Sequence, residues 1–267
     1  MKGEDSMMIS LYSAATGMLA QQFKLDTISN NLANVDTSGY KKVRAEFEDL
    51  IYQHAKSSGA PITGGSVTPT GLYVGLGTRI SASTRIFTMG TLEYTGNALD
   101  MAIAGDGFFQ VQLPDGRIAY TRDGSFKMDS EGRLVTSNGY FLVPNITIPQ
   151  NTTSITVTED GNVVAELSDG TTQTVGTITL VRFVNPSGLK SIGNNLFVQT
   201  GASGAPIEGT PGQDGFGAIR QNYLEKSNVD VVKEMVGMIT AQRAYELNSR
   251  AIMTADDMLR TLTAIKR

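Results

Sequence analysis

Cysteine is absent from this sequence of 267 residues, and histidine occurs only once, as His54. The first absence excludes disulfides, thiolate metal sites and cysteine nucleophiles. A single histidine cannot form a zinc site built from several histidines, and His54 has no nearby partner for a catalytic triad. We therefore expect His54 to be a solvated loop residue.

Long apolar runs are also missing. No stretch reaches the 18 or more uninterrupted apolar residues that a transmembrane helix needs, so we expect no direct membrane insertion. Residues 1–6 are polar and do not resemble a secretory signal. We expect any export to use a route that cleaves no signal peptide. Met1, Met7 and Met8 are each possible starts of the natural chain.

An excess of positive charge is missing as well. Lys and Arg number 22 against 26 Asp and Glu, which gives a net charge of −4 and argues against a nucleic-acid partner. Hydrophobic residues make up 40% and charged residues 18%, which is typical of a folded chain rather than a disordered one. The length favours one or two compact units.

Signatures of catalysis are weak. The glycines of residues 105–107 lack the third glycine of a nucleotide loop and precede an expected strand, so we reject that interpretation. Four central aspartates could be considered as paired acids or calcium ligands: Asp100, Asp106, Asp115 and Asp123. Their spacing does not fit a calcium loop, and turn chemistry explains most of them. We predict no enzyme activity, no cofactor and no metal site.

The two ends of the chain carry helical patterns. In residues 8–35, apolar or small residues recur mostly every three or four positions: Met8, Leu11, Ala15, Met18, Leu25, Ile28, Leu32 and Val35. In residues 227–265 the corresponding stripe is Val229, Val232, Val236, Ile239, Ala244, Leu247, Ala251, Ala255, Met258, Leu262 and Ile265. Ser227 or Asn228 is the expected N-cap of the second helix. A helix of this length is typical of a rod or coiled coil.

The middle of the chain shows turn signals between short strand-like runs. Six Asx-Gly or Glu-Gly pairs mark turns, ending at Gly116, Gly124, Gly132, Gly139, Gly161 and Gly170. The expected strands are residues 108–113, 134–136, 154–158, 162–167 and 177–184. This pattern predicts antiparallel hairpins. Residues 57–77 and 200–217, rich in Gly, Ser, Thr and Pro, are expected linkers.

These patterns predict an α+β fold. Each terminal helix has an apolar stripe that it cannot bury alone, so we expect the long helices to pair in a coiled-coil-like layer beside a central antiparallel β-rich domain. We expect three parts: a helical core of residues 8–35 with 226–265, a stiffening linker of 36–95 with 216–225, and a β-rich outer domain of 96–215. Such a helix pair would be marginal alone and stable in an assembly.

Four motifs in order resemble the flagellar axial proteins, a family of rod and hook subunits. They are residues 30–34 (Asn-Asn-Leu-Ala-Asn) with 37–40, residues 100–111, residues 120–126, and residues 227–230 with 242–246. Together they cover essentially the whole chain from Met8. Residues 47–53 and the following Gly-, Pro- and Thr-rich stretch to Arg79 are similar to family members that build the distal rod.

The resemblance implies a mechanical function rather than chemistry. It implies a subunit that polymerises into a straight hollow shaft in the flagellar basal body, where the rod crosses the periplasm, transmitting torque and letting export substrates pass. The implied partners are further copies of the chain, other rod proteins, hook or hook-junction proteins, the surrounding P/L ring and the flagellar type III export apparatus. A proximal rod protein of the same family is one alternative. A β-rich secreted binding module and a hydrolase using the central aspartates are the alternatives from other classes.

Eight residues of the terminal motifs are the predicted inter-subunit contacts: Asn30, Asn31, Leu32, Asn34, Gln242, Arg243, Tyr245 and Glu246. For the three asparagines, local hydrogen bonding at a helix end is an equally good and compatible interpretation. For Arg243 we hypothesise an ion pair or polar contact across subunits.

Overall fold

Segments from both ends of the chain build the first of two units. In the computed structural model, which describes residues 2–56 and 70–265, this unit comprises the described parts of Met1–Leu32, Val43–Thr84 and Val231–Arg267. Its elements are α1 (Lys2–Ala33), β1 (Val43–Asp49), β2 (Tyr52–Lys56), β3 (Leu72–Gly75), β4 (Thr78–Arg85) and α2 (Val231–Ile265). The predicted terminal helices are therefore confirmed, and α2 is about 50 Å long at 1.5 Å per residue.

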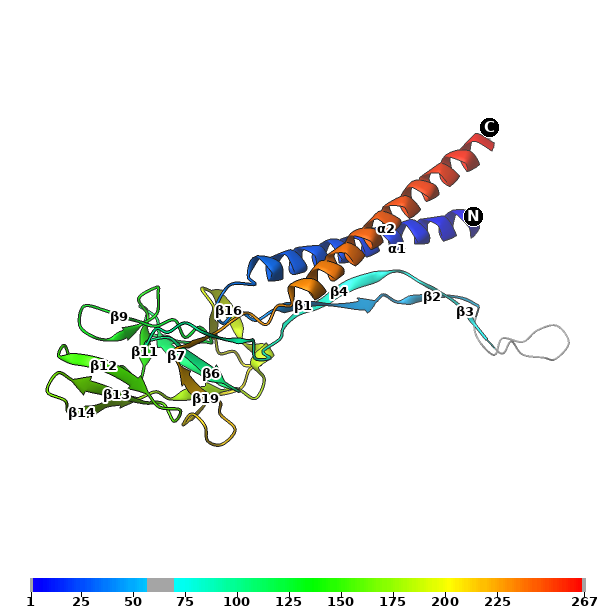
Figure 1. Ribbon diagram of the computed structural model, residues 1–267. Helices are drawn as coiled ribbons and strands as arrows, with labels where there is room; N and C mark the ends of the chain where they lie inside the picture. Colours follow the sequence, from blue (N-terminus) through cyan, green and yellow to red (C-terminus); the bar gives the residue numbers. More distant parts are fainter. Residues whose placement is uncertain (1, 57–69, 266–267) are drawn as a thin grey trace. The chain divides into compact units, whose positions relative to one another are not determined.

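The two helices pack against each other in antiparallel directions. A side chain added at Gly17 would lie 2.8 Å from Asn248 Nδ2, while the Asn31 amide lies 3.4 Å from the Glu234 carboxylate. Moving forward along α1 therefore means moving backward along α2. Figure 1 shows the start of α1 and the end of α2 at the same end of this helix pair. The prediction that α1 and α2 pack together is confirmed.

A ribbon of two strand pairs completes the first unit. β1 pairs with β4, and β2 pairs antiparallel with β3. His54 lies on β2 rather than in the expected loop. Of the expected linker 57–77, residues 57–69 lie outside the described residues, and the remainder carries β3.

The second unit comprises Ala33–Lys42 and Arg85–Asp230. Its elements are β5 (Leu92–Tyr94), β6 (Met101–Ala104), β7 (Phe108–Gln112), β8 (Ile118–Thr121), β9 (Lys127–Met128), β10 (Leu134–Val135), β11 (Phe141–Val143), β12 (Thr152–Val157), β13 (Asn162–Leu167), β14 (Thr172–Thr177), β15 (Leu180–Arg182), the short 3-10 helix η1 (Pro186–Gly188), β16 (Lys190–Gly193), β17 (Leu196–Val198), β18 (Ile207–Gly209), β19 (Ala218–Gln221) and β20 (Tyr223–Glu225). The α+β class with a central β-rich region is confirmed.

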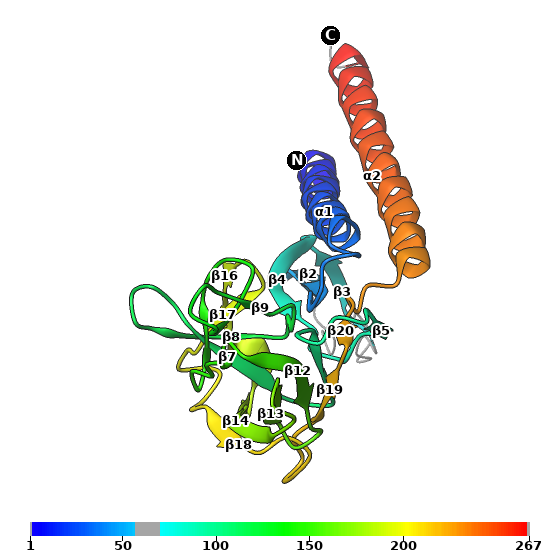
Figure 2. The ribbon, with the colours of Figure 1, turned by 60° about the vertical axis from the view of Figure 1, so that its left-hand side comes forward.

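Antiparallel pairing organises these strands. The largest sheet has nine strands, with β16-β17-β8-β7-β11-β10-β9 as its main path and with β15 joining β7 to β18. A three-stranded sheet has the order β12-β13-β14, and β19 pairs with β6 as β20 does with β5. Figures 1 and 2 show β12, β13 and β14 as neighbouring ribbons. One core cluster joins the two larger sheets through Phe109 and Val111 of β7 and Val163 of β13, all fully buried.

Five of the six predicted turns have a glycine in the left-handed region, as a tight turn of this kind requires. Their φ angles are +81° at Gly116, Gly132 and Gly139, +84° at Gly161 and +78° at Gly170. Gly124 is the exception. It is needed because the backbone approaches closely there: a Cβ at this position would lie 1.6 Å from Met101 O.

Two further sequence predictions differ from the structure. Helix α2 begins at Val231, three or four residues after the predicted N-cap. Asn228 instead donates from Nδ2 to Ile86 O and accepts from Lys42 N, each at 2.8 Å. The expected linker 200–217 contains β18 and the buried side chain of Phe216, so it belongs to the β-rich unit. The finer division into core, stiffening linker and outer domain stays a prediction.

Candidate functional site

The predicted contact residues lie in two places along the helix pair. Asn30, Asn31 and Leu32 are in the last turns of α1, and residues 242–246 are in the middle of α2. Because Asn31 lies beside Glu234, the second cluster begins eight residues further along α2, which is about 12 Å at helical rise. The structure therefore does not bring the two clusters together within one chain.

Asn31 is buried and works inside the unit. Its Nδ2 donates to Val43 O at 2.8 Å, and its Oδ1 accepts from Val43 N at 2.9 Å. Asn30 is exposed and Leu32 is half-buried. In the second unit, Asn34 is half-buried and accepts a hydrogen bond from the Thr37 hydroxyl at 3.2 Å. Local hydrogen bonding thus accounts for part of this motif, and its contact with another subunit stays a prediction.

Helix α2 carries two faces of low polarity, and only one of them packs on α1. The packed face is rich in small residues and contains Gly237, Met238, Ala241, Asn248 and Ala255, all buried or half-buried. Large aliphatic side chains of the predicted stripe remain exposed by 48–70%: Val232, Val236, Ile239, Leu247 and Met258. Small residues allow close approach of α1, so the bulkier face is left without a partner among the described residues.

Arg243 lies within this exposed aliphatic stripe. It is one helical turn from Ile239 on one side and from Leu247 on the other, so the three side chains are neighbours on the helix surface. Gln242, Tyr245 and Glu246 are exposed as well. Arg243 is thus a cation with exposed aliphatic groups on both sides, which is an arrangement typical of a contact surface with a polar anchor.

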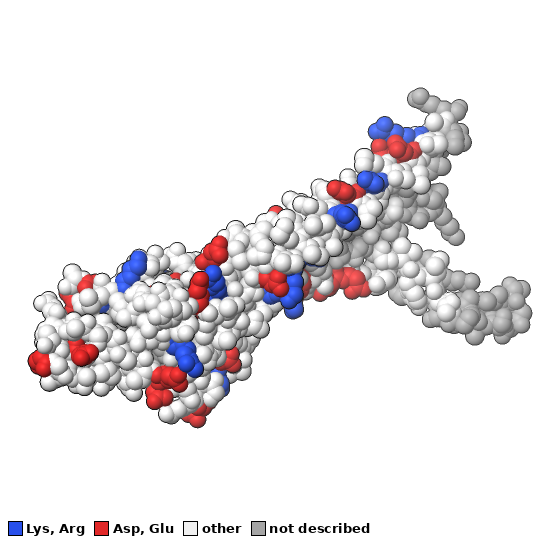
Figure 3. Space-filling model, viewed as in Figure 1, with Lys and Arg blue, Asp and Glu red and all other residues white. Residues whose placement is uncertain are grey.

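Exposed apolar side chains continue on α1. Met8, Tyr12 and Leu19 are each more than half exposed. Acidic and basic side chains are interspersed on the face seen in Figure 3, and neither sign forms a continuous patch there. We therefore infer that the helical unit makes its contacts mainly through exposed apolar side chains, and not through a patch of acidic or basic residues.

A buried ion cluster in the second unit escaped the sequence analysis. Lys41 Nζ lies 2.6 Å from Glu225 Oε1, and Arg122 Nη1 lies 3.5 Å from Glu225 Oε2, with all three side chains almost fully buried. Burial lowers the pKa of Lys41, and the charge of Glu225 opposes this shift. Lys41 also donates to Thr88 O at 2.8 Å. The only sequence signal was the position of Arg122 inside the 120–126 motif.

The central aspartates are dispersed. Asp100 accepts from Thr95 Oγ1, and Asp123 accepts from the backbone of Ser125 in its own turn. Hydrogen bonds from the Arg117 backbone and side chain lower the pKa of Asp115. A general acid would need a raised pKa, so Asp115 does not have the property that this role requires.

Within 2–56 and 70–265, no three histidine or acidic side chains lie close enough to hold a metal ion. None of the described helices combines the length and the apolar character that crossing a membrane requires.

Three family models match the chain in order. Residues 11–41 match a model described as "Flagella basal body rod protein". Residues 102–165 match "Flagellar hook protein FlgE/F/G D1 domain", and residues 220–265 match "Flagellar basal body rod FlgEFG protein C-terminal". The first match covers α1 from residue 11 onward, the last covers all of α2, and the middle match falls within the β-rich unit.

Several curated proteins are similar over nearly their whole length. The flagellar basal-body rod protein FlgG of Borreliella burgdorferi is 52% identical over 98% of this chain and 100% of its own. The FlgG protein of Buchnera aphidicola subsp. Acyrthosiphon pisum is 50% identical over 97% of this chain and 100% of its own. The FlgG protein of Agrobacterium fabrum is 49% identical over 94% of this chain and 97% of its own.

Proposed function

This chain belongs to the flagellar basal-body rod protein FlgG family, and from this premise we propose that it is a structural subunit of the distal rod. Copies of the chain polymerise into a straight hollow shaft in the basal body. The shaft transmits torque from motor to hook and leaves a channel for export substrates. The subunit performs no catalysis, and the dispersal of its aspartates supports this view.

The observation that carries this proposal is the exposed aliphatic stripe of α2. Five large side chains along one helix face are about half or more exposed, although α2 already packs on α1 through its other face. At roughly 25 cal/mol per Å² of apolar surface, covering such a face favours association strongly. A repeated contact with α helices of neighbouring copies would cover it in every subunit of the polymer.

Further partners follow from the place of a distal rod in the flagellum. We expect contacts with other rod proteins, with hook or hook-junction proteins and with the surrounding P/L ring. We also expect export through the flagellar type III apparatus. The interspersed charges of Figure 3 support partners other than nucleic acid.

Polymerisation of the purified full-length chain tests the proposal. We expect filaments, seen by electron microscopy, above a critical concentration. Ile239→Asp should abolish them, because it places a charge in the stripe without touching the core of either unit. Met128→Asp is the matched control, since Met128 is similarly exposed but lies on β9 of the other unit. A wild-type chain that stays monomeric at all concentrations, or filaments unaffected by Ile239→Asp, would contradict the proposal.

A further inference from the structure

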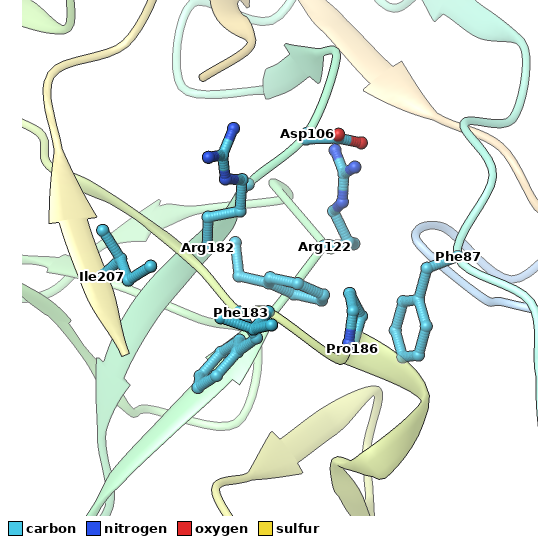
Figure 4. Close-up of a pocket in the computed structure, with 10 residues that line it drawn as sticks. Phe87, Asp106, Arg122, Arg182, Phe183, Pro186 and Ile207 are labelled. Atoms are coloured by element: carbon cyan, nitrogen blue, oxygen red, sulfur yellow. The ribbon is translucent and has the colours of Figure 1, made fainter. Parts of the chain in front are cut away.

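A pocket of about 410 Å³ lies in the β-rich unit, and all of its lining residues belong to that unit. Aromatic rings and proline line one part of it, and two arginines line another: Phe87, Phe108, Phe183, Pro186, Arg122 and Arg182. In Figure 4 the guanidinium groups of Arg122 and Arg182 lie at the same end as Asp106. Phe87, Phe183 and Pro186 lie at the opposite end of the view. The pocket thus has a polar end and an apolar end.

Arg182 is held in place but keeps hydrogen-bonding capacity. Its guanidinium lies over the Phe216 ring at 5.4 Å, and Nη1 donates to Gly215 O at 3.2 Å. Among the described residues, no carboxylate lies within 4 Å of the Arg182 guanidinium, and neither Nε nor Nη2 of Arg182 makes a hydrogen bond. These two nitrogens form the edge of a guanidinium that binds a carboxylate in a bidentate manner.

The other charges near the pocket largely neutralise one another. Lys41 and Arg122 are cations, and Glu225 pairs with both of them. Asp106 is exposed and near enough to Arg122 for its charge to oppose the lowering of the Arg122 pKa by burial. Of the two arginines that line the pocket, Arg122 is already paired with Glu225, whereas Arg182 has no carboxylate partner among the described residues. A ligand that complements this pocket carries one negative charge.

The rim of the pocket is apolar and exposed. Val184 is 81% exposed and Ile207 is 45% exposed, and both line the opening. Aromatic walls, an arginine with unused donors and an exposed aliphatic rim are features of the energetic centre of a protein interface. The complementary group is therefore a carboxylate next to an apolar side chain.

We propose that this pocket is a socket for an acidic side chain, flanked by an apolar residue, from a neighbouring copy of the same chain. The inference rests on the proposed function, because a polymer presents every surface of one copy to the next. A concave site filled by a convex segment from elsewhere on the chain is a heterologous contact. Heterologous contacts that do not close into a ring build helical filaments, which is what a rod requires.

The lack of cysteine makes a direct test simple. In filaments of the full-length chain, Val184→Cys labelled with a maleimide-benzophenone should cross-link under light to a second copy, giving a product of twice the subunit mass. The peptide captured should contain Asp or Glu beside an apolar residue. Ile192→Cys on β16, which is 41% exposed, is the control position away from the pocket. Capture only within the same subunit, or no more capture than at residue 192, would overturn the proposal.

Two substitutions test the chemistry of the socket. Arg182→Gln should raise the critical concentration for filaments at least about fivefold, because a charge-assisted contact at an interface centre is lost. Val184→Asp should act in the same direction by repelling the incoming carboxylate, and its high exposure leaves folding unaffected. Normal assembly of both variants would refute the socket while leaving the rod function intact. Failure of the wild-type chain to polymerise would instead refute the proposed function itself.

Discussion

The side-chain amide of Asn31 makes two hydrogen bonds with the backbone of Val43: Nδ2 donates to Val43 O at 2.8 Å, and Oδ1 accepts from Val43 N at 2.9 Å. The same Nδ2 lies 3.4 Å from Glu234 Oε2. Only 2% of the side chain is exposed. One buried amide therefore joins the end of α1, the first residue of β1 and the first turn of α2.

Asn31→Ala should destabilise the helical unit by about 1–3 kcal/mol, because both backbone groups of Val43 lose their partner. Chemical denaturation followed by helical circular dichroism measures this change. Ser29→Ala is the matched control, since Ser29 lies in the same turn region of α1 and is exposed. Equal stability of the two variants would show that the Asn31 contacts contribute nothing.

Within residues 2–56 and 70–265, Glu225 is the only carboxylate within 4 Å of both buried cations, so its removal should cost more than the removal of either one. Glu225→Gln leaves the charges of Lys41 and Arg122 without the carboxylate that pairs with them, and should destabilise the β-rich unit by about 3–5 kcal/mol. Lys41→Met should cost clearly less, because Glu225 keeps Arg122 beside it. Denaturation followed by tyrosine fluorescence measures both variants. The reverse order of costs would contradict this account of the cluster.

Local chemistry made much of the fold predictable. The Asp169-Gly170 turn needs a residue with positive φ, and glycine after aspartate indicates that turn without any knowledge of the rest of the chain. The spacing of apolar residues predicted α2, and the strand at 162–167 was predicted with its observed bounds. Each of these signals lies within a few residues of the structure it specifies.

Tertiary contacts explain what could not be predicted. Lys41 and Glu225 are 184 positions apart, and nothing near Lys41 distinguishes it from its neighbour Lys42 as the buried one. Asn228 looked like an N-cap because its side chain suits that role, but it bonds to Lys42 and Ile86 instead. The apolar spacing of α2 likewise predicted a buried stripe, yet periodicity alone could not say which face meets α1 and which stays exposed.

Gly124 is required by close backbone approach rather than by an unusual φ. A methyl group at residue 124 would overlap the carbonyl oxygen of Met101. The backbone N–H of Met101 donates to Gly124 O at 3.0 Å, so the two segments are held close together. Gly124→Ala should therefore separate these segments and destabilise the β-rich unit by about 3 kcal/mol. Gly201→Ala should stay within about 1 kcal/mol of wild type, because no atom lies within 4 Å of the added group. Thermal unfolding of the two variants makes the comparison. A small loss at residue 124 would show that the backbone there can move apart at little cost.

Arg243 should matter for assembly and not for folding. It is exposed on α2, and it lies between Ile239 and Leu247 in the aliphatic stripe. If it makes an ion pair or polar contact with a neighbouring subunit, Arg243→Ala should impair filament formation. The unfolding of the isolated subunit should change by less than about 0.5 kcal/mol, as for other surface substitutions.

Arg260→Ala provides the control for Arg243→Ala, because Arg260 is an exposed arginine on the same helix that lies about 100° around the helix axis from Arg243, outside the stripe. Electron microscopy of both variants, with circular dichroism to confirm folding, separates assembly from stability. Arg243→Lys adds a test of geometry: a bidentate contact needs the planar guanidinium, so lysine should restore assembly only in part. Full assembly of Arg243→Ala would remove this residue from the contact surface and leave the aliphatic side chains as its sole basis.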